Sequence, residues 1–373
     1  MKIAFVMDDL SVHSNGTSVT ALRYAEELRR QGHEVRLVGF GAHGPESFPV
    51  AEHYIPVVTE VSEQEGFHFA KPDDAVFSEA FEGMDIIHLF LPFELERHAL
   101  DWAKTHHVPA TGAFHLMPES ITYGANIGAA APVCDVIYDL WRDQFYNHVQ
   151  HVHTISPLMK RLLEQHGYTA TIHVISNGVP PEFKQDPHKT FNDGLVHIVT
   201  VGRLAHEKNQ KVIIEAIQRS HHADEIQLHI CGTGPLASSL ANMGKALPYP
   251  PIIAYLSAEQ LINLEQRCHF YVHASLVDSE AISVVEAIAC GCIPLIGKAP
   301  LSAPREFALT PESLFPVHDA DTLATHIDWW IDHPEARTEW QPHYLAEAEN
   351  LRIENCVKQF VAMEQQAIAD SGY

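Results

Sequence analysis

The chain has 373 residues, of which 46% are hydrophobic and 19% charged, as in an ordinary water-soluble protein of two domains. Its formal net charge of −24 argues against nucleic acid as a partner, because phosphate binding needs basic patches, and it also disfavours docking on an anionic membrane. No stretch approaches the roughly 20 uncharged apolar residues of a membrane span, so we expect a cytoplasmic protein, at most peripheral at the inner face of the cell membrane.

The cysteines and histidines form neither a disulfide pattern nor a metal-binding pattern. Six cysteines are scattered without a C-x-x-C pair, so we expect reduced and mostly buried thiols. The 27 histidines include two adjacent pairs, but no H-E-x-x-H or Cys/His spacing accompanies them. We therefore predict that the protein has no metal site.

Short β-branched or apolar runs alternate with helical patterns along the first half of the chain. The predicted strands are Ile3–Met7, Val35–Phe40, Asp85–Phe90, Val108–Phe114, His151–Ser156 and Ile172–Ser176. This alternation is typical of a parallel α/β sheet. Because ligands bind beyond the carboxyl ends of parallel strands, candidate functional residues are sought in the strand-to-helix loops.

The first of these loops contains Asn15, Gly16 and Thr17 immediately before a predicted helix. A glycine lets a ligand approach the backbone, and a helix N-terminus offers N–H groups and a partial positive charge to an anion. The three residues are therefore candidates for substrate binding. An ordinary helix cap with a tight turn has the same pattern.

The predicted strand Val108–Phe114 is followed directly by His115. At a strand end, its ring or its backbone carbonyl can meet a reacting group, which makes it a candidate catalytic residue. A structural histidine at the end of a strand is the alternative.

The alternation of strands and helices restarts after Pro180–Gly194, a segment rich in Pro, Asp and Gly that we interpret as a linker. We expect one domain over residues 1–185 and another over 186–354, followed by an amphipathic helix within 355–373. The strands predicted for the second domain are Val196–Val201, Ile226–Cys231, Ile252–Leu256, Phe270–Ala274 and Ile293–Ile296.

The first strand-to-helix loop of the second domain supplies Gly202, Arg203 and Lys208. Two cations at one strand end suit a diphosphate, because they neutralise its charge and the charge that grows as a nucleotide diphosphate leaves. A solvated pair of loop charges is the alternative. The next loop supplies Gly232 and Gly234, but the third glycine of a dinucleotide fingerprint is missing, which argues against NAD.

The stretch DSEAISVVEAIACG places two carboxylates eight positions apart. Asp278 falls in the loop after a predicted strand, and Glu286 falls in the helix that follows. Carboxylates accept hydrogen bonds from vicinal hydroxyls, so the pair is suited to the two sugars of a sugar nucleotide, while the helix amides meet its phosphates. The spacing is a weak signal alone, and a loop charge beside a helix-surface charge is the alternative. Together with Arg203 and Lys208 it indicates a donor site.

Asp319 and Asp321 form a D-x-D sequence of the kind that binds metal in other transferases. Here the two residues directly precede an amphipathic helix, where aspartates cap free N–H groups and complement the helix dipole. We therefore predict a helix cap and no metal ligand.

The set and order of these motifs resemble glycosyltransferase family 4, whose members are retaining, sugar-nucleotide-dependent enzymes of GT-B fold. The likeness covers nearly the whole chain and looks closest to the bacterial branch of diacylglycerol glucosyltransferase-like proteins. It implies two Rossmann-like domains that face a cleft, an N-terminal acceptor domain and a C-terminal donor domain, with the C-terminal helix crossing back. The segments that carry the resemblance are NGTSVTALRYAEELRRQGHEV, AFHLMPESITYG, HTISPLMKRLL, VISNGV, VGRLAHEKN and DSEAISVVEAIACG.

The resemblance implies roles for the charged residues of the second domain. Arg203 and Lys208 would bind the donor diphosphate, and Glu286 would bind the ribose hydroxyls. Asp278 would hold the transferred sugar, although the family generally has glutamate at this position. Glu280 stands two residues further on and is a second candidate for that role.

The resemblance also assigns contacts to backbone and first-domain groups. Amides at Ala281 and Ile282, with Ser283 beside them, would contact sugar or phosphate. Gly16 and its neighbours would line the donor phosphates or the acceptor, and His115 would flank the anomeric centre.

The first domain departs from lipid-acting relatives, which often dock on membranes through a basic amphipathic helix. The segment Glu60–Glu82 carries seven acidic residues (Glu60, Glu63, Glu65, Asp73, Asp74, Glu79 and Glu82) against a single Lys71. Anionic lipid should repel this segment, so membrane contact is not supported by charge.

The expected function is retaining transfer of a hexose, glucose, from UDP-glucose to an acceptor hydroxyl of diacylglycerol or another glycolipid. UDP-glucose is here a co-substrate, and neither a cofactor nor a metal is expected. Three alternatives stay open: a soluble transferase acting on a glycan or small molecule, a non-catalytic nucleotide-sugar-binding protein, and a GT-B epimerase.

Overall fold

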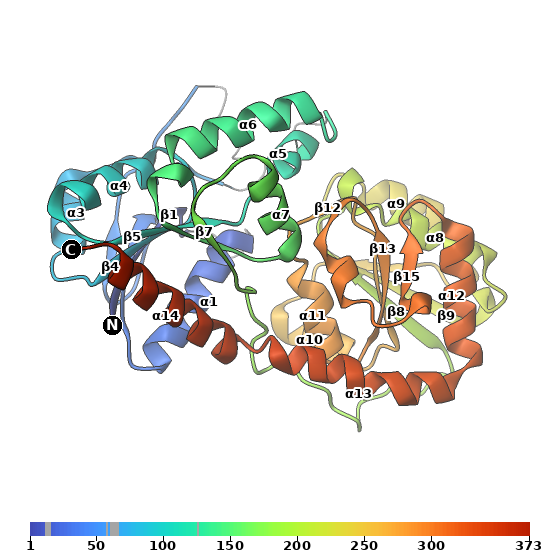
Figure 1. The fold of residues 1–373 in the computed structure, drawn as a ribbon. Helices are drawn as coiled ribbons and strands as arrows, with labels where there is room; N and C mark the ends of the chain where they lie inside the picture. Colours follow the sequence, from blue (N-terminus) through green and yellow to red (C-terminus); the bar gives the residue numbers. More distant parts are fainter. Residues whose placement is uncertain (12–15, 57–58, 60–66, 125–126) are drawn as a thin grey trace. The chain divides into compact units, whose positions relative to one another are not determined.

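The structure, a computed structural model, describes residues 1–11, 16–56, 59, 67–124 and 127–373 (Figure 1). Asn15 and the acidic residues Glu60, Glu63 and Glu65 lie outside the described residues. The chain forms two compact units, Met1–Asn177 together with Ile353–Tyr373, and Gly178–Arg352. Each unit contains a parallel sheet, which confirms the predicted α/β class.

The first unit is built on a seven-stranded sheet in the order β3-β2-β1-β4-β5-β6-β7, with every pairing parallel. Its strands are β1 (Lys2–Asp9), β2 (Glu34–Phe40), β3 (Ser47–Pro49), β4 (Ile86–Leu89), β5 (Ala110–Phe114), β6 (His151–Thr154) and β7 (Thr171–Val174). The order places β1 beside the central strand β4, and folds of this kind bind ligands beyond the carboxyl ends of such strands.

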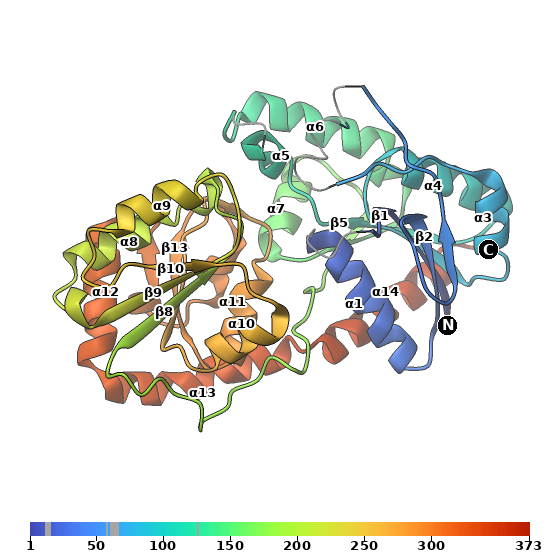
Figure 2. The ribbon, with the colours of Figure 1, turned by 180° about the vertical axis from the view of Figure 1, so that it is seen from behind.

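Helices cover the sheet of the first unit. Helices α1 and α14 lie side by side, and they pack with Ile3, Phe5 and Met7 of β1 in one core (Figures 1 and 2). Alternate residues of a strand point to opposite faces, so this row fixes the face that the two helices cover. The helices are α1 (Gly16–Arg30), α3 (Asp74–Ala80), α4 (Glu94–His106), α5 (Pro118–Gly124), α6 (Ala131–Gln144), α7 (Pro157–Gln165) and α14 (Ile353–Asp370).

The second unit has a six-stranded parallel sheet in the order β10-β9-β8-β11-β13-β15, and β12 pairs separately with β14. Its strands are β8 (Val196–Val201), β9 (Ile226–Cys231), β10 (Ile252–Ala254), β11 (Phe270–His273), β12 (Val277–Asp278), β13 (Ile293–Lys298), β14 (Leu301–Ser302) and β15 (Leu314–Pro316). Its helices are α8 (Lys211–Arg219), α9 (Ala237–Gly244), α10 (Ala258–Glu265), α11 (Ile282–Ala289), α12 (Ala320–Asp332) and α13 (Pro334–Asn350).

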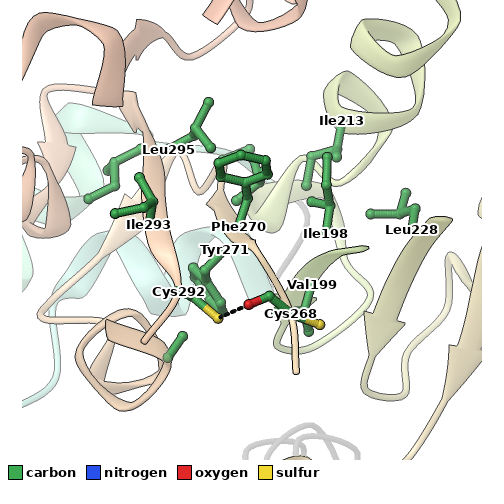
Figure 3. Close-up of a cluster of buried hydrophobic side chains, with 14 of the residues drawn as sticks. Ile198, Val199, Ile213, Leu228, Cys268, Phe270, Tyr271, Cys292, Ile293 and Leu295 are labelled. Carbon is green, nitrogen blue, oxygen red and sulfur yellow. Dashed lines mark hydrogen bonds between the residues drawn. The ribbon is translucent and has the colours of Figure 1, made fainter. Parts of the chain in front are cut away.

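The core of the second unit follows from the parallel register of its central strands. Ile198 pairs with Leu228 and Phe270, so their side chains form one row that meets Ile213 of α8 (Figure 3). The next row includes Val199, which faces the other side of the sheet. Both faces of the strands are buried, which explains why the sequence reads as continuous apolar runs.

Two edge strands were not predicted from the sequence. β3 and β15 contain three residues each, and both end in a proline. A run of three residues is too short to show an alternating pattern, and proline is disfavoured in strand interiors but tolerated at edges and ends.

The chain end is tied to the first sheet by a buried polar cluster. The side chains of His88 on β4, Thr111 on β5 and Glu364 on α14 are fully buried. The Thr111 hydroxyl donates to the Glu364 carboxyl at 2.9 Å, and His88 Nδ1 lies 2.9 Å from Glu364 Oε1. Helix α14 is thereby anchored to strands more than 250 residues earlier in the chain.

All six cysteines are free and buried, and the burial confirms that part of the prediction. Among the described residues, no helix combines the length and the apolar character that crossing a bilayer requires.

Candidate functional site

The predicted site residues of the second unit gather at the carboxyl ends of β8, β9 and β11. The loops after β8 and β9 pack backbone against backbone, and Gly202 N donates to Cys231 O at 2.9 Å. A Cβ atom at Gly232 would lie 2.0 Å from Gly202 O, and one at Gly234 would lie 2.5 Å from Leu204 O. The packing of the two loops therefore requires glycine at positions 232 and 234, whether or not they also contact a ligand.

Lys208 and Asp278, predicted separately from two motifs, are in direct contact. Lys208 Nζ lies 2.5 Å from Asp278 Oδ2, and the ammonium stem passes beside Gly202. His273, the last residue of β11, brings its Nε2 to 3.4 Å from the same carboxylate oxygen. These groups form a compact charged cluster at the end of the sheet.

The cluster fixes the charge of its acidic member. Burial by itself raises the pKa of Asp278, but Lys208 and His273 outweigh burial and hold the pKa well below its ordinary value. Burial lowers the pKa of His273, against the opposing effect of Asp278. At neutral pH Asp278 is therefore a carboxylate, and His273 is a neutral imidazole.

The turn between β8 and α8 holds both predicted cations. Arg203 is partly exposed, and its guanidinium lies 3.0 Å from Glu207 Oε1. The Glu207 carbonyl accepts a hydrogen bond of 2.7 Å from Leu276 N, which joins this turn to the loop after β11. Arg203 and Lys208 are thus positioned on one ordered turn whose cationic groups suit phosphate oxygens.

Helix α11 begins from a strained residue. Ala281, its N-cap, has φ 54° and ψ 68°, a left-handed conformation that a residue with a Cβ adopts at a cost. Ser283 in the first turn accepts a hydrogen bond of 2.8 Å from the Tyr271 hydroxyl, which anchors this turn to β11. Ile282 is the first residue of α11, and the first amides of a helix can donate hydrogen bonds to an anion.

The two remaining acidic candidates are buried. Glu280 is 3% exposed and Glu286 is 6% exposed, so Glu286 is no helix-surface charge. Glu286 lies close enough to the buried Glu265 to contribute, after burial itself, to raising the pKa of that carboxyl. A carboxyl group buried in this way is hydrogen-bonded within the protein or to a ligand.

Two of the three candidates in the first loop can be placed in the structure. Gly16 is the first residue of α1, and the side chain of Ser18 donates to Asp9 O at 2.6 Å. A Cβ at Gly16 would meet no described atom within 4 Å, so packing against the described part of the chain does not require this glycine. Thr17 is half-buried, and Asn15 falls in a part of the chain that the structure does not describe.

His115 follows β5 in the first unit and is 7% exposed. Neither ring nitrogen has a hydrogen-bond partner among the described residues, and the ring packs edge-on against His153. Burial, together with the neighbouring His153 and His88, holds its pKa well below the ordinary value. The ring is therefore neutral, with two polar atoms left to contact a ligand.

The D-x-D sequence forms the predicted helix cap. The Asp319 side chain accepts hydrogen bonds from the backbone N–H groups of Asp321 and Thr322 at the start of α12. The carboxylate satisfies donors that the helix leaves free, as the capping prediction required.

Sequence reasoning missed His273, Tyr271 and Glu207. A polar residue that ends an otherwise apolar strand, as His273 does, is a usable signal for a strand-end site. Tyr271 lies within the strand, where its side chain looks like an ordinary core residue, and the pairing of Glu207 with Arg203 appears only in three dimensions.

Two family models match consecutive parts of the chain. Residues 14–183 match the family described as Glycosyltransferase Family 4, and residues 182–343 match the family described as Glycosyl transferases group 1. The boundary between the matches lies close to the boundary between the two compact units.

Two related proteins are named as glycosyltransferases. A GDP-mannose-dependent alpha-mannosyltransferase from Corynebacterium glutamicum is 27% identical over 313 residues, which cover 80% of this chain and 72% of the relative. The gpi3 subunit of the Schizosaccharomyces pombe phosphatidylinositol N-acetylglucosaminyltransferase is 29% identical over 174 residues, which cover 43% of this chain and 37% of the relative.

Solved structures share the fold over nearly the whole chain at low identity. Sucrose-phosphate synthase from Thermosynechococcus elongatus has a TM-score of 0.74 at 16% identity and covers 99% of both chains. Anabaena HepE in complex with UDP-glucose has a TM-score of 0.71 at 16% identity, with coverage of 99% of this chain and 98% of HepE. Together with the family models, these neighbours confirm the predicted fold class. The chain is a glycosyltransferase of GT-B type, with a family 4 domain followed by a group 1 domain.

Proposed function

We propose that this glycosyltransferase moves a hexosyl group, glucose, from UDP-glucose to an acceptor hydroxyl with retention of configuration. The contact of 2.5 Å between Lys208 and Asp278 carries the proposal, because it joins a phosphate-binding cation to a sugar-binding carboxylate at one strand end. An ammonium group has three donors, so Lys208 can keep Asp278 and still contact a diphosphate oxygen. Arg203 and the first amides of α11 supply further donors to the same anion.

The proposed catalysis is mainly electrostatic. A double displacement would need a carboxylate free to attack the anomeric carbon, as in retaining glycosidases. Asp278 is held by Lys208 and is a weak candidate for such a nucleophile. We therefore favour a route in which the leaving phosphate accepts the acceptor proton on the same face. Lys208 and Arg203 would then stabilise the charge that develops on that phosphate.

UDP-glucose is the favoured donor because Anabaena HepE, a structural neighbour, is seen with UDP and with UDP-glucose. A second donor, GDP-mannose, is favoured by the relationship to the Corynebacterium mannosyltransferase. Both donors carry the diphosphate that the two cations suit, so the choice between them depends on the base and the sugar hydroxyls.

A thermal-shift panel of UDP-, GDP- and ADP-sugars on the whole chain tests the donor, since a ligand of the folded state raises the melting temperature. We expect UDP-glucose to give the largest shift. A shift with GDP-mannose and none with UDP-glucose would replace the proposed donor. Release of glucose or its transfer in the purified protein would exclude a non-catalytic sugar-nucleotide-binding protein.

For the acceptor, the likeness to diacylglycerol glucosyltransferase-like proteins supports a glycolipid, whereas the acidic first domain favours a soluble glycan or small molecule. Flotation with anionic liposomes separates the two. Co-flotation is expected for a lipid acceptor, and exclusion from the vesicles would favour the soluble acceptor.

A further inference from the structure

The first unit contains a small pocket of about 200 Å³ that none of the predicted site residues lines. Asp8, near the end of β1, is its most deeply buried acidic residue and is 1% exposed. The other lining residues used below are His53, Phe69, Phe93, Arg97 and Trp141.

Asp8 shares its surroundings with a second buried acid, Glu96 of α4, which is fully buried. Asp8 Oδ1 accepts a hydrogen bond of 2.8 Å from Ala70 N. Among the described residues, Asp8 Oδ2 and both carboxyl oxygens of Glu96 have no protein donor. Two adjacent buried carboxyls cannot both be ionised, so the pair holds a proton between them.

Burial is the main cause that raises the pKa of Asp8 to about 6, and the charges of Asp9 and Glu94 add to it. Burial and Asp8 raise the pKa of Glu96 well above its ordinary value. Near neutral pH the pair therefore carries one proton and one charge, and Asp8, the member that lines the pocket, can accept a hydrogen bond. Hydroxyl groups can donate to such an acceptor.

The walls of the pocket are aromatic. The rings of Phe69 and Phe93 meet edge-to-face with centroids 5.2 Å apart, and Phe93 meets Trp141 at 6.1 Å. Such a wall offers flat apolar faces above a polar floor, the arrangement found in sites that take a partly apolar ligand and orient it with few polar groups.

The charged groups of the rim contact other protein groups. Arg97 lines the rim and donates to Gln144 at 2.5 Å. Glu94 pairs with His53 at 3.0 Å. A lipid chain would leave the carboxyl pair without a polar partner, at a cost. The volume admits one unit of about the size of a sugar ring.

We infer that this pocket binds one neutral, polyhydroxylated unit, a sugar ring or a polyol, through Asp8, with the buried Glu96 behind it, and through the Phe93–Trp141 wall. That the bound unit belongs to the acceptor rests on the proposed function. The inference that the pocket binds such a unit does not rest on the proposed function, because every group involved lies in the first unit.

The test is a saturation-transfer NMR titration of the whole chain with methyl α-D-glucopyranoside, with excess UDP present to occupy a donor site. We expect saturable binding that weakens about tenfold or more in Asp8→Asn, which removes the charged acceptor, and several-fold in Phe93→Leu. Asp135→Asn, an exposed acidic position on α6 outside the pocket, should bind as the unmodified chain does. Thermal melts check that each variant is folded, and Phe93→Leu keeps the test decisive if Asp8→Asn does not fold.

Choline and octanol serve as cationic and apolar probes in the same titration. Preferential binding of either, no saturation by methyl glucoside, or unchanged binding in both folded pocket variants overturns the inference. Shifts with nucleotide sugars, measured on the same samples, report on the second unit separately. A failed donor choice and a failed pocket assignment are therefore distinguishable.

Discussion

Lys208 and Asp278 lie 70 residues apart in the chain, and their contact gives the cation a fixed position at the end of β8. If Lys208 stabilises the departing diphosphate, Lys208→Ala should lower kcat by about 10²-fold or more, the scale of removing one oxyanion donor. Steady-state kinetics with saturating donor measure this. Lys211→Ala, which removes an exposed lysine at the start of α8, should leave kcat unchanged. Near-normal turnover of a folded Lys208→Ala protein would contradict the assignment.

The left-handed backbone of Ala281 is strained because the residue has a Cβ, and a substitution can measure this strain. Ala281→Gly should raise the free energy of unfolding by about 0.5 to 1 kcal/mol, since the relief of strain exceeds the added entropy of glycine. Urea unfolding of the purified protein measures the change. The same substitution at Ala287, in the buried interior of α11, should instead destabilise by about 1 kcal/mol or more. Equal effects at both positions would mean that Ala281 stores no strain.

At the scale of residues, the sequence indicates which side chains belong to the donor site but not which of them contact one another. Arg203, Lys208, Asp278 and Glu286 each follow from residue type and strand-end position. The contact between Asp278 and Lys208 depends on how the loops after β8 and β11 come together. Residue spacing within one segment cannot predict this. His273 is recognisable only once β11 is known to end there.

At the scale of elements, periodicity finds the central strands, because their apolar runs are long enough to distinguish from helices. The predicted strand Val196–Val201 coincides with β8, whereas the three-residue edge strands β3 and β15 lack a readable pattern. The Pro180–Gly194 segment looks like a linker by composition. In the structure it packs on the second unit, since Phe183 is buried in that core and Arg352 donates to Phe183 O at 2.6 Å.

The α12 cap gives a prediction at this scale. Asp319→Ala removes the acceptor for two N–H groups and should cost about 0.5 to 2 kcal/mol of unfolding free energy. Asp321→Ala should change stability by less than about 0.5 kcal/mol, because the Asp321 side chain forms an exposed ion pair with Arg219. Chemical denaturation compares the two variants. Activity that is lost in both and restored by added Mn²⁺ would instead indicate a metal-binding D-x-D.

For the whole molecule, buried titratable groups in both units set the pH of maximum stability. Burial keeps four histidines neutral by lowering their pKa values below 6.5, the value of an exposed histidine. The pKa is about 3 for His88 and His153 and about 4 for His229 and His269. The unfolded chain binds more protons in that range, so each histidine's contribution is present above about pH 6.5 and is lost as pH falls toward 4. The slope is about 1.4 kcal/mol per pH unit for each group.

Buried acids act in the opposite direction. The pKa of Asp8 is raised to about 6 and that of Glu364 to about 8, so the folded state keeps protons that the unfolded chain loses. Their contribution is greatest in acid and is lost as pH rises toward 8. The two trends together predict that the free energy of unfolding is greatest near pH 6.5. Urea unfolding at a series of pH values measures this maximum. A maximum above pH 8 would show that the acids are ionised in the folded protein.

Glu364 allows the alkaline side of this profile to be isolated, because it sits in the cluster that anchors α14 to β4 and β5. The folded state holds its proton up to about pH 8, whereas the unfolded chain releases it near pH 4.5. Glutamine has nearly the same shape and no proton to release. The stability of Glu364→Gln relative to the unmodified chain should therefore increase by about 1.4 kcal/mol per pH unit between pH 5 and 8.

Urea unfolding of both proteins at pH 5, 6.5 and 8 measures this increase. The matched control is Glu354→Gln in the first turn of the same helix, where the side chain is partly exposed and lies 3.5 Å from Arg30. That substitution should shift stability by no more than about 1 kcal/mol at each pH. A difference for Glu364→Gln that does not change with pH would mean that Glu364 is ionised against a protonated His88. The cluster would then be a buried ion pair, and removing one partner should destabilise α14 docking by about 3 kcal/mol or more.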